Sequence, residues 1–104
     1  MSASLAEASF QKGMVSWYGK ENRRGSNGKI LTKTKPALAH KHLPFGTYVK
    51  IISIRTKKYT IAVVEDRGPY TKGRIADLNY VAAKQLGILK DGITLATLEP
   101  LTSK

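Results

Sequence analysis

The fold is decided by two β-forming stretches in the middle of the chain, Tyr48–Ile54 (YVKIISI) and Tyr59–Val64 (YTIAVV). Both are rich in the β-branched and aromatic residues that favour strands. The short connection Arg55–Lys58 lies between them, and this arrangement predicts a β-hairpin. The centre of the protein is therefore predicted to be antiparallel sheet.

More strands are predicted on both sides of this hairpin. Gly13–Tyr18 alternates and contains β-formers, Ala37–His40 is a short strand or a turn, and Ile93–Glu99 alternates apolar and polar residues. The segment Glu65–Pro69 (EDRGP) is predicted to break the strand that precedes it. Four or five strands with one helix favour a small closed barrel or a sandwich over a wound α/β sheet.

One short helix is predicted over Tyr80–Leu86, starting from the segment Asp77–Asn79. Asp77 or Asn79 is expected to be its N-cap, because both side chains accept hydrogen bonds from the first helical N–H groups. Gly87 is expected to end the helix, since glycine adopts the left-handed conformation without steric cost.

The length of 104 residues is that of one domain. We expect residues 1–11 to be an N-terminal tail, residues 12–101 the barrel domain and residues 102–104 a C-terminal tail. No run of about 18 apolar residues occurs, so no membrane span is expected. The first residues are too short and polar a stretch for a signal peptide, and none is expected in this chain.

The net charge of +11 favours partners that are polyanions. Nucleic acid, an anionic membrane and an anionic cell-wall polymer all fit this charge, as does a merely solvated surface. The basic residues are spread over the whole chain and no nucleic-acid-binding motif occurs, so nucleic acid is not expected as a partner.

The chain has no cysteine and two histidines, His40 and His42. The absence of cysteine excludes disulfides, thiolate metal sites and a cysteine nucleophile. Two histidines without a neighbouring carboxylate make a weak metal site. We therefore expect neither a metal nor another cofactor.

Acidic residues are scarce, and three of them lie around the predicted break between strand and helix: Glu65, Asp66 and Asp77. Glu65 and Asp66 are adjacent, so on an extended chain only one of them lines a given groove. Structural alternatives exist for each candidate. Asp66 would be a turn residue that accepts backbone N–H groups, Asp77 a helix N-cap, and Arg67 an ion-pair partner of either acid.

The aromatic residues gather near predicted turns, at Trp17, Tyr18, Phe45 and Tyr70. A groove lined by aromatic rings and hydrogen-bonding side chains suits sugars or bases. Trp17 also has a structural alternative, which is to fill the barrel.

Five short motifs in order resemble the rare lipoprotein A (RlpA) family. They are SWYG (16–19), NG (27–28), LAHKHLPFGT (38–47), DRGPY (66–70) and KGRIADL (72–78), followed by AAKQLG (82–87). The resemblance covers about residues 13–98. It implies a mainly β fold, a six-stranded double-psi β-barrel with one or two short helices, related more distantly to barwin-type proteins and to the first domain of expansins.

The resemblance also implies a substrate and a reaction. Members of the family act as lytic transglycosylases on the glycan strands of bacterial peptidoglycan, preferring strands stripped of stem peptides. Asp66 matches the family's catalytic aspartate and His40 its groove histidine. Asp77 matches an aspartate that expansin-like barrels place beside the first.

The same resemblance implies a location in the periplasm or outside the cell, with peptidoglycan or another wall polysaccharide as partner, and we expect a monomer. The residues expected to bind that substrate are Trp17, Tyr18, Asn27, Lys29, Arg67 and Tyr70.

One position departs from the family pattern. The residue after Asn27 and Gly28 is usually a groove glutamate, and here it is Lys29. A cation in place of an anion disfavours a neighbouring general acid, while it suits the binding of a substrate carboxylate. The alternative function is therefore a non-catalytic, expansin-like barrel that binds wall polysaccharide.

Overall fold

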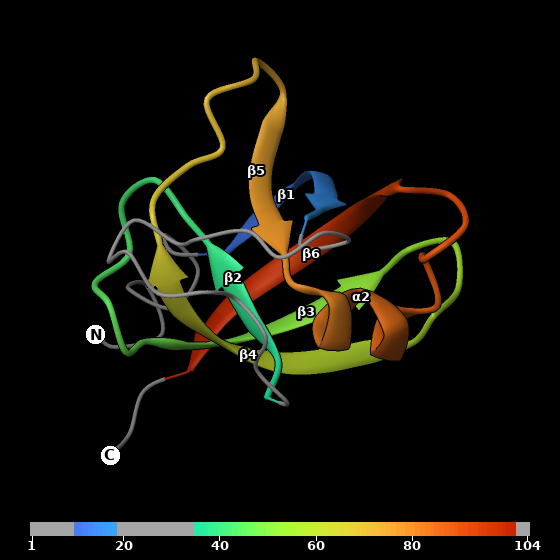
Figure 1. The fold of residues 1–104 in the computed structure, drawn as a ribbon, viewed down its shortest axis with the longest axis horizontal. Coiled ribbons are helices and arrows are strands. Elements are labelled where there is room, and N and C mark those ends of the chain that lie inside the picture. Colours follow the sequence, from blue (N-terminus) through green and yellow to red (C-terminus); the bar gives the residue numbers. More distant parts are fainter. Residues whose placement is uncertain (1–9, 19–34, 102–104) are drawn as a thin grey trace.

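The computed structural model describes residues 10–18 and 35–101, which form a closed barrel of six strands with a helix packed against it (Figure 1). In chain order the elements are β1 (Gln11–Trp17), β2 (Ala37–Ala39), β3 (Tyr48–Ser53), β4 (Tyr59–Asp66), β5 (Arg74–Leu78), α2 (Tyr80–Leu86) and β6 (Ile93–Leu101). Within these residues, no helix has the length and apolar character that crossing a membrane requires.

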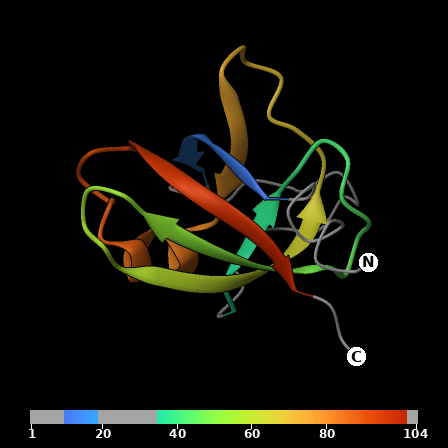
Figure 2. The ribbon, with the colours of Figure 1, turned by 180° about the vertical axis from the view of Figure 1, so that it is seen from behind.

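The strand order around the barrel is β1-β5-β2-β4-β3-β6. The pairs β1–β5 and β2–β4 are parallel, and the other four pairs are antiparallel. Figure 2, which views the barrel from behind, shows β6 crossing it between β1 and β3. The predicted mainly β, six-stranded barrel is confirmed, and in the closed barrel each described strand has a neighbouring strand on both sides.

The central hairpin is confirmed as β3 and β4, which pair in antiparallel register from Tyr48 opposite Val63 to Ile52 opposite Tyr59. The backbone N–H of Ser53 donates to the carbonyl of Lys58 at 3.0 Å and closes the connection. The predicted break at Glu65 is wrong, because β4 continues through Asp66. Its end pairs with β2, a partner that is distant in sequence.

Of the two predicted N-caps, the Asp77 alternative is wrong, because Asp77 lies inside β5, a strand that was not predicted. This strand is held between β1 and β2, so its extended conformation depends on two non-local partners. A register shift between Met14 and Val15 leaves Ile75 unpaired, which disturbs the simple alternation by which a strand is recognised.

Helix α2 has the predicted bounds, and both of its ends are formed as expected. Asn79 is the N-cap, and its side chain accepts a hydrogen bond from the N–H of Ala82 at 3.0 Å. Gly87 follows the helix with a φ of 77°, and its N–H donates to the carbonyls of Ala83 and Lys84.

Replacing Gly87 with alanine is expected to lower the free energy of unfolding by about 1 kcal/mol, because a φ of 77° is unfavourable for a residue with a Cβ. The added Cβ would lie 3.3 Å from Cδ of Lys58, a flexible side chain that can move aside. Urea denaturation measures the change. Gly92→Ala is the matched control, because Gly92 has a φ of 78° with nothing within 4 Å of the added atom. A loss at Gly87 far above that at Gly92 would contradict a backbone cause.

The core lies inside the barrel and beneath α2. It is built mainly from aliphatic side chains, with Trp17 and Ile75 packed against its margin. The largest fully buried apolar residues are Leu38, Ile51, Leu78, Leu86, Ile88 and Leu98.

Candidate active site

Four residues from four strands stand in one row across the barrel. Ser16 of β1 is in register with Asp77 of β5, Asp77 with Ala39 of β2, and Ala39 with Asp66 of β4. Side chains at paired positions share a face of the sheet. The row therefore places Asp66 and Asp77 on one face, two strand spacings or about 10 Å apart at Cα.

The orientation of Asp66 depends on an irregularity in β4. Leu38 pairs with Val64, but the next residue, Ala39, pairs with Asp66, so Glu65 is an extra residue. Leu38 and Val64 belong to the contiguous core cluster, whereas Ala39, although buried, and Asp66 lie outside it. An extra residue of this kind re-aims the side chains that follow it. It gives Asp66, rather than Glu65, the place in the row.

Asp66 is fixed through both its side chain and its backbone. Its Oδ1 accepts a hydrogen bond from the N–H of Arg67 at 2.9 Å, which is the contact expected of a turn residue. Its carbonyl accepts from the N–H of His40 at 3.1 Å. The end of β4 is thereby held beside the start of the loop after β2.

Asp77 is oriented by two residues that the sequence did not single out as functional. The hydroxyl of Ser16 donates to Oδ1 of Asp77, and Nη1 of Arg74 donates to the Ser16 hydroxyl at 3.1 Å. Asp77 is not the helix N-cap. The Asp77 carboxylate thus accepts a hydrogen bond from Ser16, and Ser16 in turn accepts one from the guanidinium of Arg74.

His40 is buried and makes hydrogen bonds through both ring nitrogens. Its Nδ1 accepts from the N–H groups of His42 at 3.0 Å and Leu43 at 3.1 Å, and its Nε2 lies 2.8 Å from Oε1 of Gln11. Because Nδ1 accepts two bonds, the proton of the neutral ring is on Nε2. Burial lowers the pKa of His40, and the neighbouring His42, Arg67 and Lys41 lower it further. The ring is therefore neutral.

This arrangement predicts that the protein loses stability in mild acid. The lowered pKa means that the unfolded chain binds the proton more readily, so the free energy of unfolding falls as the pH drops below about 6.5, the ordinary pKa of histidine, and is constant above it. His40→Asn should flatten this dependence. Urea denaturation at pH 7.5 and pH 5.5 (about one unit either side of that pKa) measures the difference. If the free energy of unfolding falls by the same amount between these two pH values in His40→Asn, His40 is not the cause of the pH dependence.

Arg67 holds the loop that follows β2. Its Nη1 donates to the carbonyls of His40 at 3.0 Å and Leu43 at 2.8 Å, and its guanidinium carbon lies 4.2 Å from the ring centroid of Phe45. A guanidinium stacked on an aromatic ring is favourably placed. The observed contacts are thus structural ones, and binding of substrate by Arg67 stays a prediction.

Tyr18 lies in the field of the acidic residues. Burial raises the pKa of its phenol above the ordinary value, and three carboxylates raise it further: Asp66, Asp77 and Glu65. The phenol oxygen is buried and has no hydrogen-bond partner among the described residues. Tyr18 therefore keeps its proton and presents a donor close to the row.

The remaining predicted residues differ in their surroundings. Trp17 packs against the core and makes an edge-to-face contact with Tyr80 at 5.9 Å between centroids, which is the structural alternative considered for it. Tyr70 is 81% exposed on the loop between β4 and β5, which projects from the barrel in Figure 1. Asn27 and Lys29 lie outside the described residues.

A cavity of about 150 Å³ adjoins His40 and Arg74. It is lined by the apolar Ile75 of β5 and by polar and basic side chains from β1, β5 and the loop after β2: Gln11, His40, Lys41, His42 and Arg74. In the described ranges, no three His, Asp or Glu side chains are grouped to hold a metal ion.

The family model described as "Lytic transglycolase" matches residues 10–97, which is most of the chain. The chain belongs to this family. An RlpA of Vibrio cholerae, named "Endolytic peptidoglycan transglycosylase RlpA", is 39% identical over 94 residues, covering 88% of this chain and 36% of the relative. A "Probable endolytic peptidoglycan transglycosylase RlpA" of Aquifex aeolicus is 39% identical over 86 residues, covering 81% of this chain and 38% of the relative. The chain thus spans somewhat over a third of the length of these relatives, and the resemblance to RlpA is confirmed.

Solved structures agree on the fold. An expansin of Clavibacter michiganensis, a point mutant in complex with cellohexaose, superimposes with a TM-score of 0.72 at 15% identity, covering 91% of this chain and 52% of the expansin. A papain inhibitor from Streptomyces gives a TM-score of 0.68 at 17% identity, covering 89% of this chain and 94% of the inhibitor. The double-psi barrel is therefore confirmed.

Proposed function

We propose that this domain is a lytic transglycosylase that cleaves the glycan strands of peptidoglycan and leaves 1,6-anhydro ends, with Asp66 as the acid and base. The names of the RlpA relatives support the substrate and the reaction. The observation that carries the proposal is the row that brings Asp66 and Asp77 from distant strands onto one face.

The reaction needs two proton transfers at one place. Asp66 in its protonated form gives its proton to the glycosidic oxygen as that bond breaks, and positive charge develops at the anomeric carbon. The 6-hydroxyl of the same sugar then attacks this carbon, and the Asp66 carboxylate takes the hydroxyl proton. The acid is regenerated and no water is consumed, so a second proton-transferring carboxylate is not required.

Asp77 has a different part in this proposal. Its carboxylate accepts from Ser16 and lies about 10 Å from Asp66 at Cα, so we assign it to stabilise positive charge on the sugar rather than to move a proton. The phenol oxygen of Tyr18 is buried, so binding of substrate by Tyr18 stays a prediction.

His40 is assigned as a positioning residue. Its two ring nitrogens are occupied by Gln11 and by the backbone of His42 and Leu43, and its pKa is lowered. A neutral ring with both nitrogens engaged is poorly suited to exchange protons with a sugar. Its contribution is to hold the loop after β2, whose carbonyls of His40 and Leu43 accept hydrogen bonds from Arg67.

The test is to incubate the protein with glycan strands stripped of stem peptides and to measure the products by mass spectrometry. Anhydro-ended fragments, lighter by one water than hydrolysis products, are the expected result. Fragments with reducing ends would instead indicate a hydrolase and would contradict the mechanism.

A second candidate is a wall-binding barrel that does not cut. It is favoured by exposed aromatic residues near the loops, with Phe45 exposed by 55% and Tyr70 by 81%, and by the net charge of +11. Sedimentation with insoluble peptidoglycan distinguishes the two. Binding with no soluble product over a long incubation would support this candidate against the enzyme.

A further inference from the structure

We propose a second binding site, at the far end of the barrel from Asp66, that takes the carboxylate groups of an anionic wall polysaccharide. We call it the basic end and define it as Arg55, Lys58, Lys84 and Lys90, which surround Gly87. The proposal rests on the proposed function only for the class of polymer.

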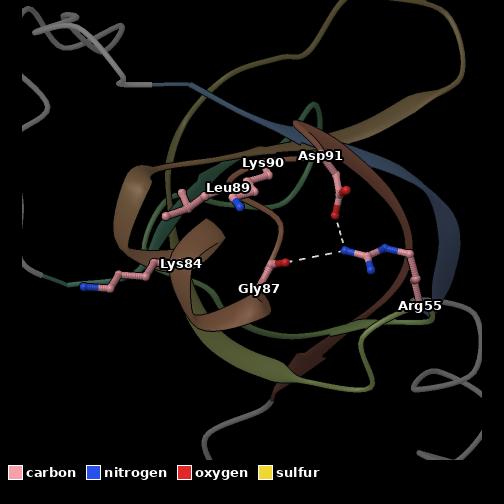
Figure 3. A pocket seen from close by; sticks show the side chains of 6 residues that line it. All are labelled: Arg55, Lys84, Gly87, Leu89, Lys90 and Asp91. Atoms are coloured by element: carbon pink, nitrogen blue, oxygen red, sulfur yellow. Dashed lines mark hydrogen bonds and ion pairs between the residues drawn. The ribbon is translucent and has the colours of Figure 1, made fainter.

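Arg55, Lys84 and Lys90 of the basic end line an open cavity of about 350 Å³, and Figure 3 shows the Lys84 side chain extending away from Arg55 and Lys90. Arg55 is held at its wall by an ion pair with Asp91 and by a bond of 3.5 Å from Nη2 to the carbonyl of Gly87. Lys84 and Lys90 also line the cavity. The Lys58 ammonium adjoins it, since a Cβ on Gly87 would lie 3.5 Å from Nζ of Lys58.

The simplest structural reason for cations here is the C-terminus of α2, whose carbonyls attract positive charge. These carbonyls already have other donors. Those of Ala83 and Lys84 accept from the backbone N–H of Gly87, and that of Leu86 accepts from the Thr56 hydroxyl at 2.7 Å. Arg55 donates a hydrogen bond to the carbonyl of Gly87. The carbonyls of Ala83, Lys84 and Leu86 therefore need no lysine as a donor.

The charges at this end do not balance. Asp91 is the acidic residue among the described residues that line the cavity, and it is already paired with Arg55. Among the described residues, Lys58, Lys84 and Lys90 have no ion-pair partner, so this end carries an excess of positive charge that a bound anion would offset. Leu89 is the apolar side chain among the described lining residues, so the cavity suits a small anionic group better than a hydrocarbon chain.

The basic end is separated from the acidic row by the length of β4. That strand has 8 residues, about 23 Å from Tyr59 to Asp66, which is more than twice the Debye length of about 8 Å at physiological salt. Figure 1 shows the two ends of β4 on opposite sides of the barrel. Charge changes at the basic end should therefore leave the chemistry of Asp66 unaffected.

The polymer that best fits is the wall glycan itself. Strands stripped of stem peptides carry a lactyl carboxylate on each muramic acid, which provides a regular series of small anions. A second strand bound at the basic end would hold the domain at the wall while the row acts on another strand.

The test compares two double variants with the same change in net charge, each in an Asp66→Asn background so that the wall is not degraded. The first is Lys84→Glu with Lys90→Glu. The control is Lys12→Glu with Lys35→Glu, at two exposed positions outside the cavity. Pull-down on beads that carry peptide-stripped glycan strands, at about 0.15 M salt, should show roughly tenfold weaker binding for the first variant and less than about twofold for the control.

Three further measurements make the proposal falsifiable. Blocking the glycan carboxylates with carbodiimide and ethanolamine should remove the difference between the two variants. An equal loss of binding in both double variants would show that the wall is attracted by the overall positive charge and not by this site. No loss of binding in either variant would show that the basic end does not bind the wall. If the first variant loses binding to phosphatidylglycerol vesicles or random duplex DNA but keeps binding to the wall, the assigned partner is wrong.

Turnover separates this proposal from the proposed function. With Asp66 intact, Lys84→Glu with Lys90→Glu should release anhydro ends from short soluble strands at a rate within about twofold of the unmodified protein. Absence of product in both proteins would defeat the proposed reaction and leave the binding result standing.

Discussion

Asp66→Asn is expected to lower the release of anhydro-ended fragments at least about 100-fold, because a positioned general acid or base contributes about 10²–10⁴ in rate. Asparagine has nearly the same shape as aspartate, and its Oδ1 can still accept the bond of 2.9 Å from the N–H of Arg67. The variant should therefore keep its fold and lose only the ability to give and take the proton. Mass spectrometry of products from stripped glycan strands measures the loss.

Glu65→Gln is the matched control, because it makes the same change in charge at the adjacent residue, which has no place in the row. Its activity should stay within about threefold, since it moves no proton in the reaction. Thermal unfolding of both variants checks that the barrel is intact. Unchanged turnover in Asp66→Asn, or equal losses in the two variants, would remove Asp66 from its assigned role.

Asn79→Ala is expected to cost about 3 kcal/mol of stability, the largest loss that we predict for a single polar side chain. Asn79 is 5% exposed, and its Oδ1 accepts from the N–H groups of Ala82 at 3.0 Å and Ala37 at 3.1 Å. Its Nδ2 donates to the carbonyl of Lys35 at 2.9 Å. Alanine removes the helix N-cap and also leaves a buried N–H of β2 without an acceptor.

The comparison with Asn79→Asp isolates the acceptor. Aspartate keeps an oxygen for the N–H groups of Ala37 and Ala82 and loses only the donor to Lys35, so it should cost about 1–2 kcal/mol. Urea denaturation of the two variants gives the difference. A smaller loss for alanine than for aspartate would show that the two accepted bonds are not the main contribution.

Local composition was enough to predict most elements of this fold. The hairpin of β3 and β4 and the helix α2 follow from β-branched runs, from Asn79 before the helix and from Gly87 after it. Each of these signals lies within a few residues of the structure that it specifies. The closed six-stranded double-psi barrel is not local in this sense, and its prediction came from the resemblance to the RlpA family.

The two errors have a common physical cause. Strand β5 and the last residues of β4 are extended because they pair with β2, and irregular registers at Ile75 and Glu65 interrupt their alternation. Asp77 has the chemistry of an N-cap, yet tertiary pairing overrode that preference. Sequence patterns do not encode such pairing in any short window.

The candidate site was predictable in part. Asp66, Asp77 and Tyr18 were singled out, and the structure brings them together. Ser16, Arg74 and Gln11 received no functional assignment, because their importance arises only from what they contact: Asp77, the Ser16 hydroxyl and His40. The motif around Trp17 contains Ser16 and was the available signal for it.

The row of Ser16, Asp77, Ala39 and Asp66 draws its members from four strands that meet only when the barrel closes. Each pairing in the row joins residues that are far apart in the sequence. A partly folded chain, in which these strands have not paired, therefore has no assembled acid site. Catalytic competence should therefore be a cooperative property that tracks the folded fraction during unfolding. Under the proposed function, the unfolded polypeptide is expected to be inactive toward glycan until these four strands have paired.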